Sequence, residues 1–259
     1  MKTEPNDVSL GLALLVSFVA WLGVIVYTIF YVLVGALILF PISLVIDRGT
    51  RKLVHWSAIL WARSIIMVTP LWRMEMNGLE KIDKNKTYLI VANHQSMLDI
   101  LILSAGLTVP FKFLAKKELF QIPFLGWHMS LARYIAVDRS SKVSRHQALV
   151  DLDYWLKQKA NVLFFPEGTR SLDGEIHDFR LAAFKIARDA NVEILPVVLD
   201  GTGQALPKHS WLLKKRTCFH LSVLDPVSVS QVPDAKLDEV KETIRVNMIA
   251  HLRSIRAQA

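Results

Sequence analysis

The feature that most constrains this chain is a long N-terminal stretch without charge. No charged side chain occurs from Val8 to Ile46, and as one continuous helix this stretch would measure about 58 Å. The hydrocarbon core of a bilayer is about 30 Å thick. We therefore expect a membrane anchor, as one span with residues to spare or as a re-entrant helical pair. A cleaved signal peptide is the competing interpretation, but its apolar region would be much shorter.

The residues that flank this stretch predict its orientation. Arg48, Arg51 and Lys52 follow the anchor closely, whereas the segment before it has mixed charge. Because basic residues stay on the cytoplasmic side, the catalytic part should face the cytoplasm, at the inner or plasma membrane if the chain is bacterial. The single Cys218 permits no intrachain disulfide, which agrees with a reducing compartment.

The segment at residues 53–72 is apolar but is interrupted by His55 and Arg63. Its three tryptophans favour a helix at the membrane interface, with a core helix of the catalytic domain as an equal alternative. We therefore divide the chain into an anchoring and interfacial helical unit, residues 1–72, and a catalytic domain, residues 73–259.

The catalytic domain alternates apolar runs of strand length with helical stretches. Tyr88–Ala92 and Asn161–Phe165 are short apolar runs, while residues 144–159 and 179–191 are typical of helices. This alternation predicts an α/β fold with a largely buried mixed sheet flanked by helices, preceded by the membrane-anchoring helical segment. No internal repeat or flexible linker indicates a second catalytic domain.

A histidine and an aspartate lie close together directly after the first of these strands. His94 and Asp99 are five residues apart, which on a regular helix would separate them by about 140°. They meet only if His94 lies in the turn before a helix, and Ser96 is a suitable N-cap for that helix. A carboxylate-bound imidazole is a general base. In the alternative interpretation Ser96 and Asp99 form a capping pair and His94 is a polar turn residue.

A second polar stretch, residues 165–171, follows the other predicted strand. Gly168 lets the backbone approach a ligand closely, and Arg170 has the planar fork that grips a phosphate through two donors. Together with His94, this loop predicts an acyl-transfer site beside an anion clamp. The alternative is a solvated loop with an incidental ion pair between Glu167 and Arg170.

The two stretches resemble the His-x4-Asp and Phe-Pro-Glu-Gly-Thr-Arg signatures of glycerolipid acyltransferases, especially the 1-acylglycerol-3-phosphate O-acyltransferases. The resemblance covers about residues 85 to 205. Two departures leave the acceptor lysolipid open: Ala132 and Arg133 stand where the family commonly has a glycine, and Arg180–Phe184 replaces its Lys-x-Gly-Ala-Phe segment. The further blocks that are similar to family motifs are Ala115–Leu119 with Ile122–Gly126, Ile135–Arg139 and Leu195–Leu199.

This resemblance implies transfer of an acyl group from a thioester to the sn-2 hydroxyl of 1-acylglycerol 3-phosphate, giving phosphatidate. The donor would be acyl-CoA or acyl-acyl carrier protein, with no metal and no other cofactor. His94 and Asp99 would be catalytic. The substrate-binding residues would be Glu167, Gly168, Thr169, Arg170, Lys116 and Arg139. The alternatives are a family member that acylates another lysophospholipid or a lyso-aminolipid and, more weakly, an inactive lipid-binding scaffold.

The formal net charge of +8 requires an acidic partner or surface. The basic residues are scattered along the chain, which disfavours nucleic acid as a partner. Lysophosphatidate and membrane phospholipids explain the charge better. The segment Trp211–Arg216 joins apolar residues to three cations and is a candidate contact with anionic lipid, with a solvated loop as the alternative. The sequence makes no prediction of the oligomeric state.

Overall fold

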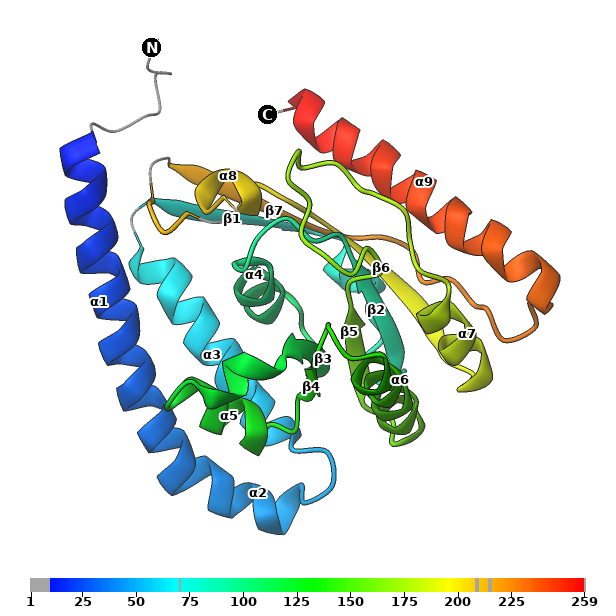
Figure 1. Cartoon of the computed structure of the whole chain (residues 1–259), viewed down its shortest axis with the longest axis horizontal. Helices are drawn as coiled ribbons and strands as arrows, with labels where there is room; N and C mark the ends of the chain where they lie inside the picture. Colours follow the sequence, from blue (N-terminus) through cyan, green and yellow to red (C-terminus); the bar gives the residue numbers. More distant parts are fainter. Residues whose placement is uncertain (1–9, 70, 208–209, 214–215, 259) are drawn as a thin grey trace.

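A mixed sheet forms the centre of the protein in the computed structural model, which describes residues 10–69, 71–207, 210–213 and 216–258 (Figure 1). Strands β6, β2, β5, β3 and β4 run parallel to one another, while β1 and β7 are parallel to each other and antiparallel to β6. The spatial order of the seven strands is β1 (Trp72–Asn77), β7 (Thr217–Val223), β6 (Glu193–Asp200), β2 (Tyr88–Ala92), β5 (Asn161–Phe164), β3 (Phe111–Lys116) and β4 (Ile135–Val137).

Helices cover both faces of this sheet and enclose two hydrophobic cores. Strand β2 shows the division, because Tyr88, Ile90 and Ala92 pack into one core and Leu89 and Val91 into the other. The first core includes α3 (Lys52–Val68) and α4 (Asp99–Gly106), and the second includes α6 (Lys142–Lys157), α7 (Ala182–Asp189) and α9 (Asp234–Gln258). The predicted α/β fold with a largely buried mixed sheet is therefore confirmed.

Shorter elements connect these layers. They are the helices α5 (Leu125–Leu131) and α8 (Thr202–Ala205) and the 3-10 turns Leu79–Lys81 and Lys117–Gln121. The predicted helices at 144–159 and 179–191 are present as α6 and α7, although both begin and end at other residues than predicted. The long C-terminal helix α9 was not predicted.

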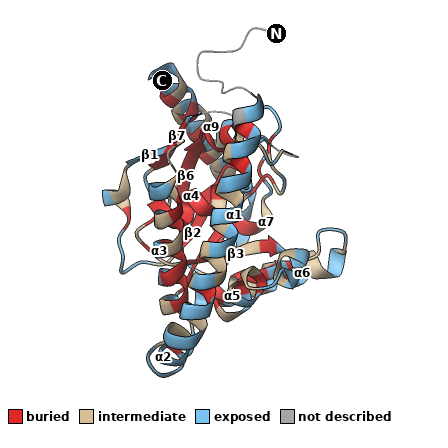
Figure 2. Ribbon diagram, turned by 90° about the vertical axis from the view of Figure 1, so that its left-hand side faces the viewer, coloured by how far each residue is buried: buried red, intermediate tan, exposed pale blue. Residues whose placement is uncertain are grey.

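The uncharged N-terminal stretch forms one continuous helical rod. Helix α1 (Leu10–Val34) passes through a π-helical turn, Gly35–Leu39, into α2 (Phe40–Ile46). Pro41 lies just after this turn, and because proline lacks an N–H and crowds the preceding turn, a wider turn accommodates it. Within the described residues, Ala13–Ile46 is the one helical stretch long and apolar enough to cross a membrane. Much of its surface is exposed (Figure 2).

Helix α1 is nonetheless fastened to the rest of the protein along one side. Ser17 Oγ accepts from the Leu213 amide at 2.8 Å, and Trp21 Nε1 donates to the Trp211 carbonyl at 2.7 Å. Farther along the helix, two more bonds join it to α3, from Tyr27 to Ser64 at 3.0 Å and from Trp61 to Thr28 at 3.1 Å. The opposite side exposes large apolar side chains, among them Phe18, Leu22, Ile25 and Phe30.

The segment predicted as either an interfacial or a core helix corresponds largely to α3. Its inner face, including Val54, Ile59 and Ala62, is buried, and the helix packs against α4. Its outer face exposes Trp56 and Leu60. The core alternative is thus confirmed for the inner face, while the exposed face agrees with a position beside the bilayer.

Gly126 supplies a test of the packing that holds α5. A methyl group at this position would lie 2.1 Å from the Phe120 carbonyl oxygen, whereas at Gly23 on α1 nothing lies within 4 Å. We expect Gly126→Ala to destabilise the fold by about 1–3 kcal/mol because backbone must move to admit the methyl group. Thermal unfolding of the detergent-purified protein measures the effect, and Gly23→Ala is the matched control. Equal melting temperatures for the two variants would show that this close approach is unimportant.

Candidate active site

The predicted site residues gather at one edge of the sheet. Strands β2, β5, β3 and β4 are parallel, so their carboxyl ends lie at the same edge. His94 follows β2, the loop 165–171 follows β5, Lys116 ends β3, and Arg139 follows β4. Ligands of open α/β sheets usually bind at this edge, so we take it as the candidate active site.

His94 and Asp99 form a buried pair at this edge. His94 Nδ1 lies 2.6 Å from Asp99 Oδ2, and the two residues are 8% and 0% exposed. The imidazole stacks on the Phe165 ring with 4.0 Å between ring centroids. Asp99 accepts a hydrogen bond from Nδ1–H. This bond fixes the tautomer and leaves Nε2 as the nitrogen that can accept a proton. The predicted meeting of His94 and Asp99 is present in the structure.

The reason that they meet differs in one respect from the sequence interpretation. Helix α4 begins at Asp99, and Ser96 is not its N-cap. Instead, Ser96 Oγ donates to the Leu206 carbonyl at 2.8 Å, and Asp99 Oδ2 accepts from the backbone amides of Gln95 and Ser96 at 2.7 and 3.0 Å. One carboxylate therefore both closes the turn and orients the imidazole. Thr202 Oγ1 donates to its other oxygen at 2.5 Å.

The loop after β5 is joined directly to the backbone of His94. Glu167 Oε1 accepts from the His94 amide at 2.9 Å and Oε2 from the His177 amide at 3.2 Å, while the Ser171 amide donates to the His94 carbonyl at 2.7 Å. Burial raises the pKa of Glu167, and the two amides act in the opposite direction. Glu167 Oε1 thus fastens the loop to the turn that holds His94, while Oε2 holds the downstream segment at His177.

Three arginines meet beside this loop. Gly168 has φ of 74°, and a Cβ atom there would lie 2.6 Å from Arg180 Cζ, so glycine permits the guanidinium to pack against the backbone. Partial withdrawal from water and the nearby charges of Arg170 and Arg180 lower the pKa of Arg139. Like charges concentrated in this way favour an anionic ligand. Sequence reasoning noted Arg180 only as a departure from a family motif and missed it as a site residue.

The other predicted substrate-binding residues occupy different environments. Lys116 Nζ lies 3.6 Å from Glu118 Oε2 and is largely exposed. Thr169 is exposed on the loop, between Gly168 and Arg170. Both lie near the same edge of the sheet as His94, and their roles in binding stay predictions.

A network that sequence reasoning missed connects the turn that holds His94 and Gln95 to the C-terminal helix α9. Gln95 Nε2 donates to the Gly174 carbonyl at 3.2 Å and to Asp200 Oδ1 at 3.4 Å. Arg256 of α9 donates to the same two acceptors, at 2.8 Å and 3.0 Å, and to Glu175 Oε1 at 2.6 Å. The guanidinium therefore holds the acceptors that position Gln95. Only the helical spacing of apolar residues after Asp234 could have indicated α9.

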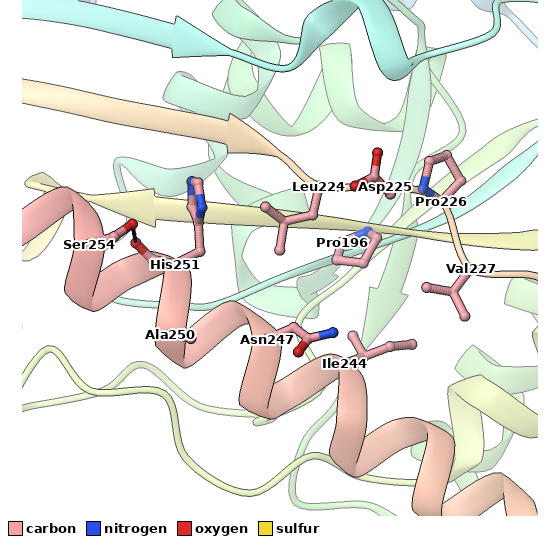
Figure 3. A pocket seen from close by; sticks show the side chains of 10 residues that line it. All are labelled: Pro196, Leu224, Asp225, Pro226, Val227, Ile244, Asn247, Ala250, His251 and Ser254. Carbon is pink, nitrogen blue, oxygen red and sulfur yellow. Dashed lines mark hydrogen bonds between the residues drawn. The ribbon is translucent and has the colours of Figure 1, made fainter.

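A cavity of about 520 Å³ lies elsewhere, between α9 and the segment that follows β7 (Figure 3). Ile244, Asn247 and His251 line it from the helix, and Leu224 and Pro226 from the opposite side. None of its lining residues is a predicted site residue. The candidate site at the sheet edge is therefore identified from its side chains and their hydrogen bonds, and not from this cavity.

Comparison with known proteins places the chain in a family. A family model described as Acyltransferase matches residues 73–200. A 1-acyl-sn-glycerol-3-phosphate acyltransferase of Saccharomyces cerevisiae is 35% identical over 217 residues, which cover 80% of this chain and 69% of the yeast protein. The chain belongs to the 1-acyl-sn-glycerol-3-phosphate acyltransferase family. The family resemblance inferred from the motifs is therefore confirmed.

Other members of this acyltransferase family match over different lengths. The chloroplastic 1-acyl-sn-glycerol-3-phosphate acyltransferase BAT2 of Brassica napus is 35% identical over 80% of this chain, but the match covers only 60% of the plant protein. The crystal structure of the 1-acyl-sn-glycerophosphate acyltransferase PlsC from Thermotoga maritima superposes with a TM-score of 0.78 at 27% identity, covering 93% of this chain and 95% of PlsC. The chain thus spans about three fifths of the plant relative and most of the bacterial one.

Arg256 lies beyond the segment matched by the Acyltransferase family model, and its contacts generate a prediction. Arg256→Ala should lower the turnover number of acyl transfer by about 10- to 100-fold, because a displaced Gln95 shifts the turn that holds His94. The Michaelis constants should change little. Arg256→Lys should not restore turnover, since a single ammonium cannot bridge several acceptors.

The exposed Arg253 on the same helix provides the control variant, Arg253→Ala. Steady-state kinetics of equally stable, purified variants decide the matter. If Arg256→Ala raises only a Michaelis constant, the residue binds a substrate and does not position the turn.

Proposed function

We propose that this protein transfers an acyl group from a thioester to the sn-2 hydroxyl of 1-acylglycerol 3-phosphate and so forms phosphatidate. The observation that carries this proposal is the buried pair of His94 and Asp99 beside the arginines of the neighbouring loop. The names of the yeast and plant relatives support the same reaction. Acylation of another lysolipid by the same base is the alternative.

In this reaction His94 is the general base. Its Nε2 removes the proton from the sn-2 hydroxyl as the oxygen attacks the thioester carbonyl carbon, and Asp99 stabilises the imidazolium that results. The tetrahedral adduct then collapses, the carbon–sulfur bond breaks, and the imidazolium returns its proton to the departing thiolate. The products are the ester and the free thiol, so neither a metal nor a redox cofactor takes part. The stacked Phe165 ring restricts rotation of the imidazole.

The arginines beside Gly168 would bind the phosphate of the acceptor. A phosphate monoester carries nearly two negative charges at neutral pH, and guanidinium groups bind it through paired, charge-assisted hydrogen bonds. Arg170 and Arg180 are our principal phosphate-binding residues, and Arg139 adds positive charge. Glu167 supports this region indirectly, since it fastens the loop to His94.

The donor is a thioester of coenzyme A or of acyl carrier protein. Both donors present the same carbonyl carbon to His94, and the proposed chemistry is identical for the two. Lys116, exposed at the end of β3, is a candidate contact for the phosphorylated carrier group of either donor. Turnover of the purified protein with each donor distinguishes them.

The exposed face of α1 would place this site at a membrane surface. The bonds of Ser17, Trp21 and Thr28 to the rest of the chain hold α1 along the catalytic domain. The continuous path from α1 into α2 does not form a re-entrant helical pair. A helix held against the protein in this way cannot be surrounded by lipid, so we propose that its outer face enters one leaflet. The basic residues after the anchor support a site on the cytoplasmic side, because such residues usually stay there.

Two cations of the predicted lipid contact, Lys214 and Lys215, lie outside the described residues. Trp211 is 52% exposed, whereas Leu213 is buried against α1. Trp211 is therefore the residue of this segment that we propose to reach the lipid surface.

Replacement of His94 tests the reaction mechanism. His94→Ala should lower the turnover number by about 10²- to 10⁴-fold, which is the usual contribution of general-base assistance. Membrane association should be unchanged. The exposed His146 on α6 supplies the matched variant, His146→Ala, which should retain full turnover. A folded His94→Ala enzyme with turnover near that of the wild type would contradict the mechanism.

Replacement of the arginines tests whether they bind the phosphate of the acceptor. Arg170→Lys and Arg180→Lys keep the charge but lose the planar fork, so each should raise the Michaelis constant of lysophosphatidate about tenfold, as expected for one lost charge-assisted bond. The constant for the thioester should stay nearly unchanged, and Arg253→Lys should alter neither constant. An effect confined to the donor would mean that these arginines bind the carrier group.

A further inference from the structure

A cluster of potential metal ligands lies on the first two strands of the sheet, outside the candidate active site. Cys218 and His220 are two residues apart on β7, and alternate strand residues point to the same face. Their neighbours Thr217, Phe219 and Leu221 are buried on the opposite face. Cys218 and His220 therefore share the less buried face of β7.

The adjacent strand β1 adds a carboxylate to this pair. Glu75 is the register partner of His220, so its side chain emerges on the same face. Glu75 Oε2 lies 3.4 Å from His220 Nδ1. One donor atom from each of Glu75, Cys218 and His220 lies within 4.8 Å of the other two.

These separations are close to those of a coordinated ion. Bonds of about 2.0–2.3 Å in a tetrahedral site place neighbouring donors about 3.3–3.8 Å apart. Small side-chain rotations are therefore enough to close the cluster around an ion, because β1 and β7 already hold the three Cα atoms in register.

We propose that Glu75, Cys218 and His220 form a binding site for a divalent late first-row metal ion of the Zn²⁺ class. A thiolate and an imidazole favour Zn²⁺ or Co²⁺ over Mg²⁺ and Ca²⁺, which prefer sets of oxygen ligands. Three protein ligands leave the fourth tetrahedral position to water. The proposal is independent of acyl transfer.

Nearby charged groups affect the binding of such an ion. Burial, followed by the Glu75 carboxylate, raises the pKa of the Cys218 thiol. A bound metal cation lowers the pKa of this thiol instead, since metal coordination displaces the thiol proton. Arg73, the register partner of Cys218, repels a cation, while the carboxylate of Asp200, the register partner of His220 on the other side, is already paired with Arg256.

The position of the site indicates its consequence. Strand β1 is at the edge of the sheet and, among the strands that the structure describes, pairs only with β7. An ion held by Glu75 of β1 and by two residues of β7 would join these strands and stabilise the folded state. A structural role of this kind predicts a gain in thermal stability without a change in catalysis.

Cobalt provides a direct test on the full-length, detergent-purified and reduced protein. We expect one Co²⁺ per chain, with the near-ultraviolet charge-transfer band that a thiolate ligand produces, and displacement of Co²⁺ by Zn²⁺. Cys218→Ser should abolish the band. Each of Cys218→Ser, His220→Asn and Glu75→Gln should weaken Zn²⁺ binding at least about tenfold. Loss of a residue that only hydrogen-bonds to a metal ligand already lowers metal affinity by about that factor.

Controls separate this site from incidental binding. His146→Asn removes an exposed histidine on α6 and should bind Zn²⁺ like the wild type. Saturating Zn²⁺ should raise the melting temperature of the wild type but not of Cys218→Ser. Glu75 is largely exposed, so Glu75→Gln should fold even if His220→Asn does not. Co²⁺ binding without the thiolate band, or equal Zn²⁺ affinity in wild type and Glu75→Gln, would overturn the proposal.

Discussion

The fully buried carboxylate of Asp99 is the constraint on which the site depends. An ionised group without solvent is costly unless hydrogen bonds compensate for the lost water. Here the amides of Gln95 and Ser96, the His94 imidazole and the Thr202 hydroxyl provide them. These donors come from the turn after β2 and from α8 after β6, so the two neighbouring strands must end together for the carboxylate to be satisfied. The hydrogen bonds that replace water around the Asp99 carboxylate thus also orient the His94 imidazole.

Much of this arrangement could be predicted from the sequence, because it depends on neighbours in the chain. The strand at Tyr88–Ala92 was predicted with its observed limits, and the spacing of His94 and Asp99 required the turn that the structure has. Ser96 was misassigned because its local capping propensity competes with a distant acceptor, Leu206. Local preferences thus predicted the turn before the helix, whereas a tertiary contact determines the role of the Ser96 side chain.

Features that depend on distant residues were beyond such reasoning. Arg256 reaches Asp200 across 56 positions, and no local pattern links the two. Arg180 lies against Gly168 only because the loop folds back on itself, with the Arg180 amide bonded to the Pro166 carbonyl at 3.0 Å. The antiparallel placement of β7 beside β6 similarly depends on strand pairing, which brings Cys218 and His220 next to β1.

The bonds between α1 and the loop at Trp211 also constrain the order of events during synthesis. Trp21 and its acceptor are 190 positions apart, so at about 5–20 residues per second the ribosome needs about 10–40 s to deliver the second partner after the first. Helix α3 is made early and can already contact the later part of α1, but throughout that interval the part of α1 around Ser17 and Trp21 lacks the loop that covers it. The nascent helix must therefore rest in lipid or on a chaperone, and completion of the chain exchanges that temporary environment for the protein's own loop.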